Sequence, residues 1–160
     1  MKEDRDIELM EEEQENTMDG KFLIFNIGDE DYGIAIRSVT EIIGILKVTD
    51  LSDMPDYVKG VINLRGKVIP VIDVRLRFRL AERDYDDRTC IIVVNIDEVS
   101  VGLIVDSVAE VQDIESGNIE PLSRIKKSAS QNFISGLGKV GNEVKILLDI
   151  RKLLFDEELD

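Results

Sequence analysis

An internal repeat constrains the fold of this chain more than any other feature of its sequence. When 69 is added to each residue number, residues 22–42 fall on residues 91–111. Adding 76 places residues 60–78 on residues 136–154. Because the two stretches follow one another in the same order in both copies, the chain is expected to consist of two similar halves. Either each half pairs its own strands, or the halves exchange strands.

Identical residues mark the aligned positions of the two halves. The first alignment pairs Asn26, Ile27, Gly33, Ser38, Val39 and Glu41 with Asn95, Ile96, Gly102, Ser107, Val108 and Glu110. The second pairs Gly60, Val68, Asp73 and Arg75 with Gly136, Val144, Asp149 and Arg151. Residues that recur in both halves usually belong to the fold. A residue present in only one half is therefore a better candidate for function.

Short runs of strand-forming residues dominate each half. Residues 22–27 and 90–96 are rich in β-branched and aromatic side chains and end at acidic turns, after which a return strand completes a hairpin. Further along, apolar runs flank the two-residue tip Arg65-Gly66, whose counterpart in the second half is Gly141-Asn142. Many short strands separated by turns predict a mostly β fold built as small barrels or a sandwich.

Helical signals are few and short. Ser38 and Glu41 have the spacing of a capping box, as do Ser107 and Glu110, so one helical turn is expected at each of these places. Asp73 and Asp149 end strands and are expected to cap short helices. The second of these helices should run from residue 150 to about residue 158.

Composition excludes several classes of function. The chain has no histidine and one cysteine, which argues against zinc sites, histidine-based triads and disulfide frameworks. Its net charge of -14 argues against nucleic-acid binding through phosphates. No segment approaches the roughly 18 to 20 apolar residues that cross a bilayer, and no signal peptide is recognisable. We therefore expect a cytoplasmic protein that does not insert into the membrane.

The first 19 residues differ from the rest of the chain. They hold nine acidic and two basic residues and few apolar ones. Repulsion between like charges and a shortage of apolar side chains predict a disordered, solvated arm.

Carboxylates are the obvious candidates for catalysis in so acidic a chain. The ones beside apolar runs are Asp73, Asp106, Asp149, Glu41 and Glu110. A hydrolase would need two carboxyl groups at a set separation, one with a raised pKa. Most of these five have simple interpretations as caps that recur in both halves, so a carboxylate-based hydrolase is the less favoured alternative. No cofactor is expected, because the glycine-rich loops that bind phosphates are absent.

Arg65 is the most informative asymmetric residue. It occupies a hairpin tip where the second half has Gly141, so the fold does not require it. A guanidinium offers a planar set of donors for carboxylates or carbonyls of a partner. Two small barrels that meet along an apolar face would also leave a groove of the kind that receives helices. The residues alone thus indicate a binding module without chemistry of its own.

Three stretches resemble the CheW chemotaxis coupling proteins. They are EDYGIAIRSVTEII at residues 30–43, KGVINLRGKVIPVIDVR at residues 59–75 and VGLIVDSVAEV at residues 101–111. The resemblance runs in order from about residue 22 to residue 155. Since 160 residues leave no room for a kinase or receiver domain, the chain is most similar to the free-standing adaptor of this family.

The resemblance implies a fold and a domain organisation. It implies two similar SH3-like five-stranded β-barrel subdomains around a shared hydrophobic core, with short helices and a C-terminal helix. Residues 20–160 would form one CheW-like domain of two repeated halves, about 20–84 and 85–160. The acidic arm lies outside the resemblance.

The resemblance also implies a function. CheW-like adaptors have no enzyme activity and join the cytoplasmic tips of methyl-accepting chemoreceptors to the regulatory domain of the chemotaxis histidine kinase, which recruits them to membrane-associated receptor arrays. Positions associated with partner contact in the family match here as Arg65, Val39, Glu41, Gly60 and Val108. A kinase-independent signalling scaffold of the same domain family is the alternative.

Overall fold

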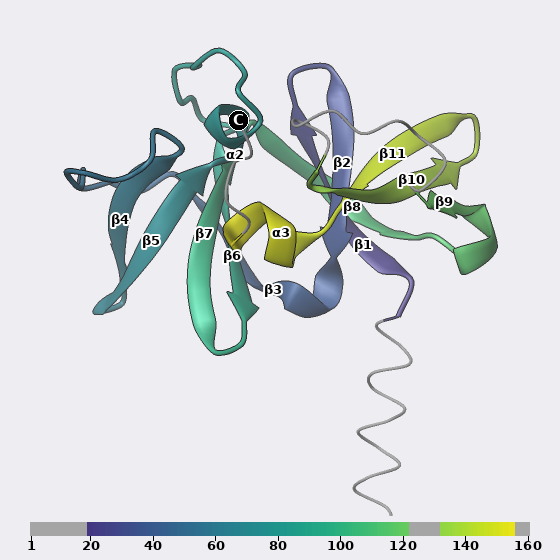
Figure 1. The fold of residues 1–160 in the computed structure, drawn as a ribbon, viewed down its shortest axis with the longest axis horizontal. Coiled ribbons are helices and arrows are strands. Elements are labelled where there is room, and N and C mark those ends of the chain that lie inside the picture. Colours follow the sequence, from purple (N-terminus) through teal and green to yellow (C-terminus); the bar gives the residue numbers. More distant parts are fainter. Residues whose placement is uncertain (1–18, 122–131, 156–160) are drawn as a thin grey trace, which may run out of the picture.

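The computed structural model describes residues 19–121 and 132–155 (Figure 1). The first part contains the strands β1 (Lys21–Ile27), β2 (Glu30–Ala35), β3 (Val39–Gly44), β4 (Val58–Leu64), β5 (Lys67–Asp73), β6 (Cys90–Ile96), β7 (Val99–Val105), β8 (Ser107–Asp113) and β9 (Ile119–Pro121). It also contains the 3-10 turns η1 (Ile36–Ser38) and η2 (Ser116–Asn118) and the short helix α2 (Val74–Arg77). The second part contains β10 (Ile134–Val140), β11 (Glu143–Leu148) and helix α3 (Ile150–Phe155).

The strands form two sheets, which confirms the predicted mostly β class. The six-stranded sheet has the order β8-β1-β2-β11-β10-β9, and the five-stranded sheet has the order β3-β6-β7-β5-β4. Each sheet therefore contains strands from both halves of the repeat. The hairpin β1-β2 lies between strands of the second half, and the hairpin β6-β7 lies between strands of the first. In both sheets a parallel pair, β2-β11 or β5-β7, makes one of the two joins.

A central hydrophobic cluster draws on both sheets and both helices. It contains Leu23, Phe25, Ile27, Ile34, Ile72, Val74, Ile92, Val94, Val101, Leu103, Val105, Phe133, Leu148, Ile150 and Leu153. A smaller cluster, made of Ile62, Ile69, Val71, Ile91, Val93 and Ile104, belongs to the five-stranded sheet alone. Alternate residues of β6 enter the two clusters, so this strand is buried on both faces. That explains its continuous apolar run.

Arg77 is a charged residue within this interior, only 1 % exposed. Its guanidinium lies between the rings of Tyr57 and Phe133, with its central carbon 4.2 and 4.5 Å from the ring centroids. Its Nε donates to the carbonyl oxygen of Leu153 at 2.8 Å, which ties α2 to the last turn of α3. Stacking on aromatic faces and a bonded carbonyl compensate for the desolvation of the guanidinium. The repeat alignment gave no sign of this contact, because the counterpart of Arg77 is Leu153 itself.

The two predicted hairpin tips are confirmed. In the register of β4 with β5, Leu64 lies opposite Lys67, so Arg65 and Gly66 form a two-residue turn. Their φ angles are 52° and 85°, both in the left-handed region, as a type I′ turn requires. The equivalent turn in the second half, between Val140 and Glu143, contains Gly141 and Asn142.

The predicted capping boxes are wrong. The segments that hold Glu41 and Glu110 are strands, β3 and β8, and the 3-10 turn η1 ends before β3 begins. Pairing of β3 with β6 and of β8 with β1 supplies the backbone hydrogen bonds that a helical turn would otherwise satisfy. The β-branched residues of β3 also favour a strand.

The predicted aspartate caps are confirmed. The amide of Leu76 donates to Oδ1 of Asp73 at 3.3 Å, and the amide of Lys152 donates to Oδ1 of Asp149 at 3.1 Å. These contacts satisfy free amides in the first turns of α2 and α3. Helix α3 begins at residue 150 as expected and is described as far as residue 155. Residues 156–158 of the predicted helix and residues 1–18 of the predicted arm lie outside the described residues.

Gly60 lies on β4, next to the point where the connection from β3 to β4 pairs with this strand through an antiparallel bridge between Thr49 and Val61. Thr49 of this connection donates to the carbonyl of Val61 at 2.8 Å and accepts from its amide at 2.9 Å. Gly60 has φ of 144°, and a Cβ atom there would overlap the carbonyl oxygen of Thr49 and lie 2.7 Å from its carbonyl carbon. In the second half, a Cβ atom on Gly136 would lie 2.8 Å from the carbonyl oxygen of Glu120, which is also too close. The fold therefore requires glycine at both positions.

We expect Gly60→Ala to destabilise the protein by about 3 kcal/mol or more, because the methyl group collides with backbone atoms at an unfavourable φ. The control is Gly117→Ala, where a Cβ would meet nothing within 4 Å. That change should stay within about 0.5 kcal/mol. Urea denaturation followed by circular dichroism measures both, and equal midpoints for the two variants would contradict the assignment.

Candidate functional site

Arg65 and Glu41 form an ion pair at the edge of the five-stranded sheet. Nη2 of Arg65, at the β4-β5 tip, contacts Oε2 of Glu41 on β3. The Arg65 side chain is 70 % exposed and that of Glu41 is 29 % exposed. Because β3 and β4 are the two outermost strands of this sheet, the pair joins its opposite edges. Two of the predicted site residues therefore lie in direct contact.

A local irregularity positions Glu41. The pairing of β3 with β6 shifts between Val39, which lies opposite Val94, and Glu41, which lies opposite Val93. Thr40 lies at this bulge, and its Oγ1 donates to the carbonyl of Val93 at 3.1 Å. A bulge redirects the side chains that follow it. The sequence indicated neither the bulge nor the contact with Arg65.

Val39 and Val108 occupy equivalent places in the two halves. Both are partly buried, and both pack against the central hydrophobic cluster. Val39 lies on β3 and Val108 on β8, and each of these strands is the outermost strand of its sheet. Each side chain thus contributes to the core and retains some exposed surface at a sheet edge. The groove expected beside them stays a prediction.

Gly60 differs from the other predicted site residues because it is buried. Its close approach to Thr49 accounts for the glycine without a partner. A contribution of Gly60 to partner binding stays a prediction, and any such contribution would act through the shape of β4.

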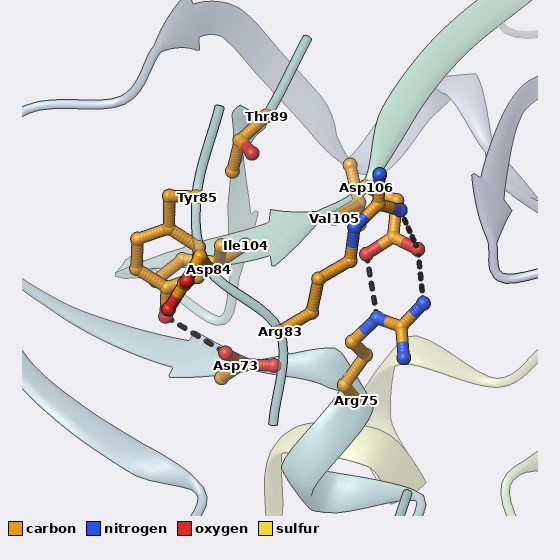
Figure 2. Close-up of a pocket in the computed structure, with 9 residues that line it drawn as sticks. All are labelled: Asp73, Arg75, Arg83, Asp84, Tyr85, Thr89, Ile104, Val105 and Asp106. Carbon is orange, nitrogen blue, oxygen red and sulfur yellow. Dashed lines mark hydrogen bonds and ion pairs between the residues drawn. The ribbon is translucent and has the colours of Figure 1, made fainter. Parts of the chain in front are cut away.

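A second polar cluster, not foreseen as a unit, surrounds Asp106 (Figure 2). Arg75 donates to this carboxylate twice, from Nε to Oδ1 at 2.8 Å and from Nη2 to Oδ2 at 2.6 Å. Nη1 of Arg83 donates to Oδ2 at 3.1 Å, and the amide of Gly28 donates to the same oxygen at 2.8 Å. The cluster ties the β1-β2 turn, α2 and the segment before β6 to the end of β7.

The environment of Asp106 shifts its titration. Burial alone raises the pKa of this carboxyl group. The hydrogen bonds from Arg75 and Gly28 and the charges of Arg75 and Arg83 outweigh burial and hold the pKa below its ordinary value. The carboxylate is therefore stabilised in its charged form, which suits a structural anchor rather than a proton donor.

Asp73 and Tyr85 form the other contact in this region. Tyr85 donates its hydroxyl to Oδ2 of Asp73 at 2.7 Å, while the other oxygen of Asp73 caps α2. Burial, followed by the hydrogen bond to Asp73, raises the pKa of Tyr85 well above its usual range. The phenol thus stays protonated and anchors the segment before β6 (Figure 2).

These contacts bear on the hydrolase alternative. Of the five candidate carboxylates, Asp73 and Asp149 cap helices and Asp106 binds two arginines. Glu41 pairs with Arg65, and Glu110 accepts from Gln112 at 2.8 Å. A separate structural partner thus accounts for each carboxylate.

Within residues 19–121 and 132–155, no group of three or more cysteine, aspartate or glutamate side chains is arranged to hold a metal ion. No helix in these parts is long and apolar enough to cross a bilayer.

The described residues form a β-rich module of two sheets with an exposed arginine at a hairpin tip. Comparison with known proteins agrees with this class. The family model described as the CheW-like domain matches residues 21–158. The chain therefore belongs to the CheW-like domain family, as the three sequence stretches indicated.

Individual relatives are similar over most of the chain. The chemotaxis protein CheW of Klebsiella aerogenes is 41% identical over 143 residues, which cover 89% of this chain and 86% of that protein. The chemotaxis protein CheW of Helicobacter pylori is 34% identical, covering 84% of this chain and 81% of that protein. The crystal structure of the scaffolding protein TtCheW from Thermoanaerobacter tengcongensis matches with a TM-score of 0.77 and 33% identity, covering 88% of this chain and 97% of that one.

The Asp106 cluster predicts a defined pH dependence. A carboxyl group whose pKa is lower in the folded state stabilises the protein above the unfolded pKa of about 3.9, and this contribution is lost as the pH falls through the folded pKa. Asp106→Asn should therefore cost about 3 kcal/mol at pH 7, since it leaves two arginines without their counter-charge. The difference between wild type and variant should shrink below about pH 4.

The matched control is Asp97→Asn. Asp97 pairs with Arg151, the repeat counterpart of Arg75, but both side chains of this ion pair are largely exposed. Its replacement should change stability far less than Asp106→Asn. Urea denaturation between pH 3 and pH 7 makes the comparison, because urea is uncharged and does not screen the ion pairs. Equal losses in the two variants, or a constant difference across this range, would argue against the proposed electrostatic role.

Proposed function

We propose that this protein is a non-enzymatic chemotaxis adaptor that joins the cytoplasmic tip of a methyl-accepting chemoreceptor to the regulatory domain of the chemotaxis histidine kinase. Membership of the CheW-like family and the names of its relatives support a coupling role in chemotaxis. The observation that carries the proposal is the Arg65–Glu41 pair, which presents an exposed guanidinium at a position that the family resemblance links to partner contact. The adaptor would act in the cytoplasm, at receptor arrays, without a cofactor.

Arg65 is suited to fix the register of a partner helix. A guanidinium has five N–H donors, and the contact with Glu41 uses Nη2. The remaining donors are available for a carboxylate or a carbonyl of the receptor. Glu41 orients the side chain before the partner arrives, and this lowers the entropy lost on binding. The apolar surfaces of Val39 and Val108 would receive the receptor's helical tip.

The kinase would bind a separate surface at the sheet edges. Strands β3 and β8 are outermost strands, and each exposes an apolar residue at the same repeat position. Ile42 on β3 is 43% exposed and Val111 on β8 is 49% exposed. Exposed apolar side chains on an outermost strand favour contact with another protein. An adaptor with two surfaces changes kinase output through its different affinities for the states of its two partners.

We further propose that each sheet closes into an SH3-like barrel and that the two form one domain over residues 20–160. Three contacts in the five-stranded sheet support closure. Ile43 on β3 and Leu64 on β4 pack against the same small cluster, Arg65 contacts Glu41, and Thr49 pairs with Val61. All three bring the β3 side of the sheet to its β4 side.

We expect Arg65→Ala to weaken binding of a receptor cytoplasmic fragment by about 10- to 100-fold, since one charge-assisted hydrogen bond contributes about 1.5–3 kcal/mol. The melting temperature should hardly change, because an exposed ion pair stabilises little. Isothermal titration calorimetry and differential scanning calorimetry measure the two quantities. Asn142→Ala, at the equivalent tip, should leave affinity unchanged. Unaltered binding by Arg65→Ala, or a collapse of its stability, would refute the assignment.

Reconstitution separates the proposed adaptor from the kinase-independent scaffold. Purified kinase, receptor fragment and this protein are mixed, and the rate of kinase autophosphorylation is measured. We expect the protein to couple receptor state to the kinase rate, and Arg65→Ala to reduce that coupling. If wild-type protein binds the receptor fragment but leaves the rate of kinase autophosphorylation unchanged, the kinase-independent scaffold is favoured.

A further inference from the structure

We propose that Asn63 is a positioning residue for Arg65: its side chain holds the β4-β5 tip in the conformation that presents the guanidinium to a partner. This inference rests on the proposed function for its effect on binding. Its structural part stands on the geometry of the tip alone. Asn63 itself is not required to touch the partner.

The tip has an unfavourable residue at its first position. Arg65 has φ of 52°, in the left-handed region, where a side chain with a Cβ crowds the following carbonyl oxygen. Glycine or asparagine normally occupies this position of a type I′ turn. Arginine therefore needs a compensating interaction to keep the turn populated.

Asn63 supplies such an interaction. Its Oδ1 accepts a hydrogen bond from the amide of Gly66 at 2.8 Å. In the hairpin register Asn63 lies opposite Val68, one pair below Leu64 and Lys67, so its side chain spans the turn from one strand. Asparagine side chains commonly stabilise turns by bonding a backbone amide in this way. The bond restrains the peptide that follows Arg65.

The second half shows that the fold does not need this side-chain hydrogen bond at a hairpin tip. The repeat places Gly141 at the position of Arg65 and Lys139 at the position of Asn63. Gly141 has φ of 60°, which costs glycine nothing, and a Cβ there would meet no atom within 4 Å. Lys139 carries no acceptor in its side chain. The asparagine thus occurs at the tip that carries the arginine, and not at the tip that carries glycine.

The hydrogen bond between Asn63 and Gly66 does not touch the Arg65–Glu41 ion pair, but the ion pair depends on the turn that this hydrogen bond restrains. Arg65 reaches Glu41 across the sheet from the turn that Asn63 restrains. If the turn relaxes, the guanidinium samples other directions, and the measured affinity equals the intrinsic affinity multiplied by the fraction of molecules that remain competent. Loss of one net hydrogen bond predicts a fall of about fivefold in partner affinity.

The test compares five variants in calorimetric binding of a chemoreceptor cytoplasmic tip fragment from the same organism. Asn63→Ala should weaken binding about fivefold, and Asn63→Asp, which keeps an acceptor oxygen, should restore most of it. In an Arg65→Ala background, Asn63→Ala should cause no further loss. Lys139→Ala, at the matched position of the other tip, should bind as wild type. Additive losses from Asn63 and Arg65 would overturn the positioning role.

A second measurement needs no partner. Amide hydrogen exchange followed by NMR should show Gly66 protected in wild type and in Asn63→Asp, and exchanging faster in Asn63→Ala, with the melting temperature lowered by no more than about 4 °C. Unaltered exchange of Gly66 in Asn63→Ala would overturn the inference. If Arg65→Ala binds normally, the proposed function fails instead. If Arg65→Ala binds weakly and Asn63→Ala normally, the positioning role alone fails.

Discussion

Packing of apolar side chains in the central hydrophobic cluster is the interaction on which the rest of the structure depends. It combines side chains from both sheets with one face of each short helix, so no sheet can bury its apolar face without the other. The buried guanidinium of Arg77 and the Asp106 cluster are placed around this interior and join segments far apart in sequence. The exposed tip that carries Arg65 belongs to the five-stranded sheet, which contributes side chains to this cluster.

Sequence patterns predicted the elements that depend on local chemistry. The hairpin tips followed from two-residue turns between apolar runs, and the helix caps followed from aspartate at the ends of strands. The capping boxes failed because the Ser38–Glu41 spacing is only a local signal, and pairing with β6 makes the segment from Val39 onward a strand. Likewise, Arg75 and Asp106 stood out separately in the sequence, but only the sheet topology brings them together.

The repeat distinguished residues that both halves share from residues found in only one half. Val39 with Val108 and Gly60 with Gly136 recur in both halves, and each pair has a packing or backbone role in the structure. Arg65 has no counterpart and is largely exposed. The partner of Arg65 could not be predicted, because contact with Glu41 arises from the approach of two outermost strands. Sequence comparison within one chain therefore found the arginine but not the ion pair.

The placement of each hairpin between strands of the opposite half limits how a single-copy form of the repeat could have folded. A single copy of the repeat with the same pairings would lack neighbours for its first hairpin and could complete its sheets only by lending that hairpin to a twin. Such a protein would exist as a domain-swapped dimer. Fusion of two gene copies would then make the swap intramolecular and free the two tips to diverge, one towards glycine and the other towards arginine.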